Sequence, residues 1–235
     1  VWDKKTIKAL GAIGAGESGR VTFNFIPRDR ASKPLTNPFI NLDVSVKAGR
    51  TSEQNVSESI KSTASRVVKI APIVSLGSNL TRASAPFEQT GSIPPKAEQV
   101  TTYTVVWTVF NTSSNISNAK VESSLPPYVK FLNKISPAGS AEQLDYNPTD
   151  GKLVWTVGSV PAYSTNGANK KEIMFQIGFQ PSVNQIGQSP DIVMPAELTA
   201  VDDFTGTAIK VGRPKLTPKV TIDSDFETGD DKVTD

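Results

Sequence analysis

The chain contains neither cysteine nor histidine among its 235 residues. Without cysteine it can form no disulfide, no thiolate zinc site and no thiol nucleophile. Without histidine it lacks the commonest general base of enzymes and the commonest protein ligand of transition metals. A serine nucleophile would need a lysine as its base, and no Gly-x-Ser-x-Gly segment is present. The sequence therefore predicts a protein that is not an enzyme.

Long apolar runs and clusters of basic residues are also missing. No stretch of about 18 apolar residues occurs, so no segment is expected to insert into a membrane. The lysines and arginines are scattered, whereas a nucleic-acid-binding surface needs them gathered. The net charge of +2 divides unevenly, because residues 219–235 hold six carboxylates against two lysines. We therefore expect neither a nucleic-acid partner nor membrane insertion.

Alternating apolar and polar residues are plentiful, and this pattern is typical of β-strands. In the segment Thr102–Phe110, Tyr103, Val105, Trp107 and Val109 fall on one face of an extended chain. Further strands are expected at 120–125, 129–135, 153–157, 173–179, 196–201 and 207–211, with a hairpin turn at 147–151. Helical periodicity is scarce: the segment 52–65 is the best candidate, and it reads equally well as a strand.

A partial internal repeat links the two halves of the chain. Val1-Trp2 precedes a turn and an apolar strand pattern that ends at Pro27, and Val154-Trp155 precedes a similar pattern that ends at Pro181. Tryptophan and proline are 25 residues apart in the first copy and 26 in the second. A repeat at this spacing indicates a tandem array. It predicts a C-terminal half-domain at 1–66, a complete domain at 67–218, and an acidic tail or linker at 219–235.

The order of the motifs resembles a known family. The strand 103–111 ends in asparagine, Leu125-Pro126 follows, and Val154-Trp155-Thr-Val-Gly158 comes later. This order resembles the immunoglobulin-like repeat of unknown function that recurs in tandem in bacterial and archaeal cell-surface proteins. The resemblance implies an all-β fold of tandem immunoglobulin-like antiparallel β-sandwiches with no catalytic residues to transfer. The long segments 78–98 and 162–171 depart from the compact pattern of that family.

Two groups of residues are candidates for defined roles. Trp2 and Trp155 hold equivalent positions in the repeat, and together with Trp107 they are predicted to lie in a core. Carboxylates at alternate positions with a glycine suit Ca²⁺, the one cofactor that the sequence suggests. The candidate ligands are Asp223, Asp225, Glu227, Asp230 and Asp231, and Asp202 and Asp203 are further possible contributors. The alternative interpretation of these carboxylates is a solvated terminus or linker.

The leading functional hypothesis is a structural component of a prokaryotic cell surface: a stalk, filament or surface-layer (S-layer) module. Its expected location is extracellular, and its expected partners are further copies of itself or neighbouring domains. A half-sandwich at 1–66 would expose a core face, which the preceding chain or a neighbouring subunit would have to cover. The alternative is an adhesin or glycan-binding module that contacts a glycan or host surface through the segments 78–98 or 162–169. A third possibility is an accessory domain of a secreted enzyme.

Overall fold

The computed structural model describes residues 2–26, 34–51, 57–165 and 169–235, which form two compact units, Val1–Pro34 and Leu35–Asp235. This division differs from the predicted domain boundaries, and the half-domain at 1–66 stays a prediction. In the first unit the one described regular element is the short 3₁₀ helix η1 (Lys8–Leu10). The strand expected just before Pro27 is not found: residues 21–26 form no strand, because no described strand lies beside them to exchange backbone hydrogen bonds.

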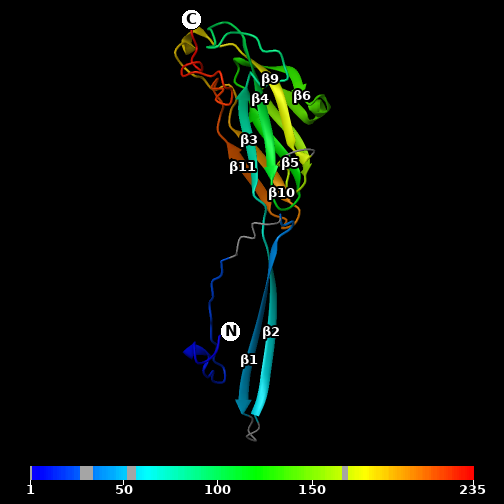
Figure 1. Ribbon diagram of the computed structural model, residues 1–235, viewed down its shortest axis with the longest axis vertical. Coiled ribbons are helices and arrows are strands. Elements are labelled where there is room, and N and C mark those ends of the chain that lie inside the picture. The colour runs from blue at the N-terminus through cyan, green and yellow to red at the C-terminus, as the bar shows by residue number, and fades with distance from the viewer. Residues whose placement is uncertain (1, 27–33, 52–56, 166–168) are drawn as a thin grey trace. The chain divides into compact units, whose positions relative to one another are not determined.

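The second unit begins with a long hairpin of two strands, β1 (Phe39–Thr51) and β2 (Ser57–Lys69). The strands are antiparallel, with Phe39 opposite Lys69 and Thr51 opposite Ser57 (Figure 1). The helical alternative for residues 52–65 is wrong from Ser57 onward, where the chain is a strand. Residues 52–56 of that expected element lie outside the described part of the chain.

Nine further strands form two antiparallel sheets in the described residues. The four-stranded sheet has the order β3-β4-β9-β6, and Figure 1 shows these strands side by side. The five-stranded sheet has the order β11-β10-β5-β8-β7. The strands of the first sheet are β3 (Val74–Thr81), β4 (Thr101–Asn111), β9 (Lys171–Phe179) and β6 (Val129–Ser136). Those of the second are β11 (Ala208–Arg213), β10 (Ala196–Asp202), β5 (Ile116–Ser124), β8 (Lys152–Val160) and β7 (Leu144–Asn147).

The core of this sandwich consists of the inward side chains of both sheets. Every second residue of β10 is buried, as expected when one face of a sheet packs on a core. Buried aromatic residues from β4, β8 and β9 belong to the same core cluster. The predicted all-β sandwich class is therefore confirmed, and the 3₁₀ helices η2 (Ala138–Gln143) and η4 (Val183–Gln185) are short additions. The described residues include no helix that is both long and apolar enough to span a membrane.

The insertion between β3 and β4 covers the outer face of the four-stranded sheet. The Nε2 atom of Gln89 donates to the hydroxyl of Thr104 at 3.0 Å, and the Thr90 amide donates to the hydroxyl of Thr102 at 2.7 Å. The side chain of Gln176 in β9 donates to the Glu88 carbonyl at 2.7 Å. These bonds explain why β4 is buried on both of its faces.

The C-terminal segment also packs against the sandwich. Val233 forms a parallel bridge with Ile186, and Thr234 forms one with Lys96. The side chains of Val220 and Val233 are buried. Val220, Val233 and Thr234 thus contact the preceding domain, while many other side chains of residues 219–235 are exposed. The acidic tail or linker at 219–235 stays a prediction.

Candidate functional sites

The three tryptophans occupy different environments. Trp107 in β4 and Trp155 in β8 both lie in the core. Trp107 meets Phe175 edge to face with ring centroids 5.0 Å apart, and its indole nitrogen donates to the hydroxyl of Ser78 at 3.2 Å. Trp2, which was also predicted to be in a core, is instead 53% exposed. The described part of the first unit has no paired strands to bury it, and its ring contacts Phe23 at 5.2 Å between centroids.

In the acidic segment, Asp223 binds protein groups. Its carboxylate accepts hydrogen bonds from the hydroxyl of Thr81 at 2.6 Å and from the backbone amides of Arg82 and Ala83 at 2.7 and 3.1 Å. Thr81 ends β3, and Arg82 and Ala83 begin the insertion, so the carboxylate fixes this turn to the C-terminal segment. Carboxylate oxygens that already accept several hydrogen bonds from the protein have fewer free lone pairs to offer a metal.

The other predicted calcium ligands do not converge. Asp225 accepts from the hydroxyl of Ser224 at 2.9 Å, and Asp230 accepts from the backbone amide of Glu227 at 2.8 Å. Within the described residues, no three acidic side chains gather into a group that could hold a metal ion. Alternate spacing in the sequence does not bring these carboxylates together, because the segment runs through successive turns rather than one loop. Calcium binding by Asp223, Asp225, Glu227, Asp230 and Asp231 stays a prediction that would require the segment to rearrange.

Asp202, at the end of β10, is the fully buried carboxylate of the sandwich in its described part. Its oxygens accept hydrogen bonds from the hydroxyls of Ser114 and Thr205 and from the backbone amides of Phe204 and Thr205. Burial raises the pKa of this carboxyl, but the hydrogen bonds outweigh it, and the net result is a pKa below the ordinary value of 3.8. The ionised carboxylate therefore organises the β10–β11 turn and ties it to the β4–β5 connection.

Replacing Asp202 with asparagine is expected to lower the free energy of unfolding at pH 7 by about 1–3 kcal/mol, the cost of a lost charged hydrogen-bond network. Because the folded pKa is lowered, this stabilisation is present above the unfolded pKa and is lost as the pH falls through the folded pKa. Urea unfolding of both proteins at pH 7 and in acid measures the difference. Asp203→Asn is the matched control, since Asp203 is exposed and accepts one hydroxyl bond, from Ser117. If the difference in unfolding free energy between the unaltered protein and Asp202→Asn is as large in acid as at pH 7, this account is contradicted.

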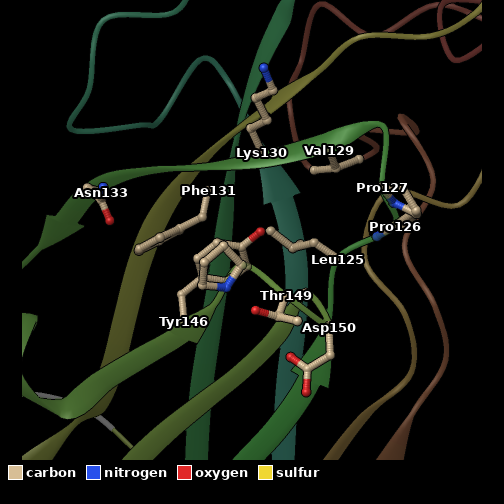
Figure 2. Close-up of a pocket in the computed structure, with 12 residues that line it drawn as sticks. Leu125, Pro126, Pro127, Val129, Lys130, Phe131, Asn133, Tyr146, Thr149 and Asp150 are labelled. Atoms are coloured by element: carbon tan, nitrogen blue, oxygen red, sulfur yellow. The ribbon is translucent and has the colours of Figure 1, made fainter.

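A pocket of about 810 Å³ opens where the edge strands β6 and β7 of the two sheets approach one another (Figure 2). Phe131 and Tyr146 lie side by side in Figure 2, with ring centroids 5.2 Å apart. Asn133, Thr149 and Asp150 add polar groups to its lining. Its volume falls in the range of small-molecule sites, and a lining that combines aromatic and polar side chains is common among them.

The sequence indicated part of this pocket and missed the rest. The turn 147–151 was predicted from its composition and is found between β7 and β8. Its position opposite β6 depends on how the two sheets stack, which no local pattern reports. The pocket does not lie in the segments 78–98 and 162–169, where the sequence predicts ligand contacts. In the second of these segments, the Tyr163 hydroxyl donates to the Leu35 carbonyl at 2.6 Å. Residues 166–168 of that segment lie outside the described residues.

The hairpin has one apolar and one polar face. Because residues opposite each other in the register share a face, the side chains of even-numbered positions lie together. We call the face formed by the even-numbered positions the apolar face of the hairpin. Its apolar members are Ile40, Leu42, Val44, Val46, Ala48, Ile60, Ala64 and Val68, and the polar residues on it are Arg50, Glu58, Ser62 and Arg66. Val46 is 57% and Ile60 is 45% exposed, so no described residue of the unit Leu35–Asp235 forms a layer over this part of the face. The other face is mostly polar, with Lys47 directly opposite Lys61, and it carries the exposed side chains of Phe39 and Val67 near its base.

No protein-family model and no curated protein matches the sequence. Among solved structures, it is similar to BcpA, the major pilin subunit of Bacillus cereus (12% identity, TM-score 0.37, 73% of this chain and 47% of that one). It is also similar to the full-length major pilin SpaD from Corynebacterium diphtheriae (12%, 0.35, 60% and 35%). A third is the C-terminal domain of the Streptococcus pyogenes antigen I/II-family protein AspA (12%, 0.29, 75% and 54%). The chain spans about a third to a half of the length of these structures.

Proposed function

We propose that this chain is a structural module of a prokaryotic cell surface that acts by self-association and by repetition of β-sandwich units. The observation that carries the proposal is the apolar face of the hairpin. A two-stranded ribbon is at best marginally stable in water, and a contiguous exposed apolar surface marks an interaction site. A role in assembly explains why the chain carries this exposed apolar face in addition to the β-sandwich.

The surrounding features support the same role. Val220 and Val233 of the C-terminal segment are buried with the core of the sandwich, which gives the hairpin a packed domain to extend from. The lack of cysteine fits a prokaryotic surface, since eukaryotic secreted domains of this kind often carry disulfides. Stalk, filament and surface-layer arrangements all follow from repeated contacts between rigid sandwiches, and the expected location is extracellular.

Electron microscopy of the 235-residue chain tests this proposal. We expect ordered filaments or a lattice to form as protein concentration rises, because covering the apolar face lowers the free energy of the assembly. Imaging is done once in millimolar Ca²⁺ and once in chelator. Loss of order in chelator would implicate the acidic residues between Asp223 and Asp231. Dispersed monomers under both conditions would contradict the structural proposal.

The pocket between β6 and β7 favours a second candidate function, an adhesin or glycan-binding module. Sugars bind where an aromatic ring offers an apolar surface beside hydrogen-bonding groups, and Tyr146 with Thr149 and Asp150 provides that combination. Tyr146→Ala should then reduce binding on a glycan array at least tenfold, while Tyr163→Ala, outside the pocket, should leave it unchanged. Absence of glycan binding by the unaltered protein would remove this candidate.

A further inference from the structure

We propose that the apolar face of the hairpin is covered by the same face of a second copy of this chain, the two hairpins packing face to face and antiparallel. The inference rests on the proposed self-association and specifies one of its contacts. A two-fold contact of this kind closes into a dimer, so filaments or a lattice require a second contact elsewhere on the chain. Figure 1 shows β1 and β2 paired along their whole described length, so both strands present a continuous face. Two such faces would form a two-layer, four-stranded structure, the smallest arrangement that buries both.

The order of residues along the apolar face makes it self-complementary. Its cross-strand pairs, from the base to the tip, are Ile40 with Val68, Leu42 with Arg66, Val44 with Ala64, Val46 with Ser62, Ala48 with Ile60, and Arg50 with Glu58. In an antiparallel stack the two central pairs lie over each other. The small side chains of Ala64 and Ser62 are then at the centre, where they let the layers approach to about 10 Å.

The size of the face suits a dimer. Each strand has 13 residues and is therefore about 43 Å long at about 3.3 Å per residue. A ribbon of two strands with its side chains is about 12–15 Å wide, so each copy offers a footprint of roughly 500–650 Å². Specific stable interfaces bury about 600–1,000 Å² on each partner. The hairpin alone thus approaches the area that a stable contact needs.

The charges select the antiparallel orientation. Arg66 lies on the apolar face opposite Leu42, and it forms no ion pair with any described residue. Glu58 lies at the other end of the face, paired with Arg50 at 2.5 Å. In the antiparallel stack, Arg66 of one copy lies one pair away from Glu58 of the other, twice by symmetry. In a parallel stack it would face Leu42 and stay unpaired.

A pair of adjacent substitutions on opposite faces tests the contact. Val44→Asp places a carboxylate on the apolar face, and Ser45→Asp places the same charge on the polar face one residue later. Sedimentation velocity across a range of concentrations gives the dimer dissociation constant. We expect dimers for the unaltered chain and for Ser45→Asp, and a dissociation constant raised at least a hundredfold for Val44→Asp.

A charge exchange separates loss of contact from loss of folding. Arg66→Glu or Glu58→Arg alone should weaken the dimer about tenfold, and the double variant should restore it, which unfolding of the hairpin cannot explain. Single cysteines carry spin labels at unique sites because the chain has none of its own. Labels at position 45, the centre of the hairpin, should be closer across the dimer than labels at position 59; equal distances would overturn the antiparallel arrangement.

The outcomes distinguish this inference from the proposed function. Ordered assemblies that Val44→Asp leaves intact would overturn the hairpin contact and leave the surface role standing. A chain that is monomeric at every concentration and forms no assembly would overturn both.

Discussion

Replacing Trp107 with alanine is expected to lower the free energy of unfolding by about 3–5 kcal/mol, a large part of the stability of an ordinary domain. The indole is fully buried in β4, packs edge to face on Phe175, and donates to Ser78. Its removal leaves a cavity between the two sheets that neighbouring residues on the strands can fill only in part, and it leaves a hydroxyl without its donor. Urea denaturation followed by far-ultraviolet circular dichroism measures the loss.

The matched control is Trp2→Ala, which removes the same side chain from an exposed position. We expect it to change the same free energy by no more than about 0.5 kcal/mol, since exposed substitutions away from special features have small effects. A similar loss for both variants would show that Trp2 is buried in the protein in solution. That result would restore the sequence-based prediction of a shared core role for the repeated tryptophans.

Replacing Gly151 with alanine is expected to cost about 2–5 kcal/mol, the sum of left-handed backbone strain and overpacking. Gly151 has a φ of 71° and lies in the turn between β7 and β8. An added Cβ would overlap the carbonyl oxygen of Leu125, and the Leu125 amide donates to the Gly151 carbonyl at 2.8 Å. The substitution should therefore also distort the pocket, of which both residues are part. Thermal and urea unfolding measure the cost.

Gly206→Ala isolates the contribution of strain. Gly206 has a φ of 73°, close to that of Gly151, but a Cβ at this position would meet no atom within 4 Å. We expect this variant to lose only about 1–2 kcal/mol, the cost of the left-handed conformation itself. Equal losses at the two positions would mean that the contact with Leu125 relaxes without cost.

Strand positions in the complete domain could be predicted because their signal is local. Alternation in 102–110, 173–179, 196–201 and 207–211 corresponds to β4, β9, β10 and β11 within one or two residues. A period of two places apolar side chains on one face whatever the strand pairs with. The turn 147–151 was equally predictable, because its composition favours the required backbone angles.

The candidate sites were harder to predict because each depends on contacts between distant residues. Asp223 reaches Thr81 across 142 residues, and Asp202 reaches Ser114 across 88. The sequence marked both carboxylates as possible metal ligands, whereas the structure uses them to fix turns. Phe131 and Tyr146 of the pocket lie on β6 and β7, which are edge strands of different sheets. No pattern in either strand alone reveals that these edges are neighbours.

The sequence by itself determined the fold class and most strands of the sandwich, because alternation, turn composition and the lack of cysteine and histidine act locally or through composition. Only the tertiary structure decided which faces are covered. Trp155 is buried because its strand has neighbours and a facing sheet, and Trp2 is exposed because the described part of its unit has neither. Eight of the twelve even-numbered positions of β1 and β2 are apolar, yet most of these side chains are exposed in this unit. Whether a side chain is buried depends on which layers pack together. An apolar pattern in the sequence indicates only that one face of a strand is suited to packing against another layer.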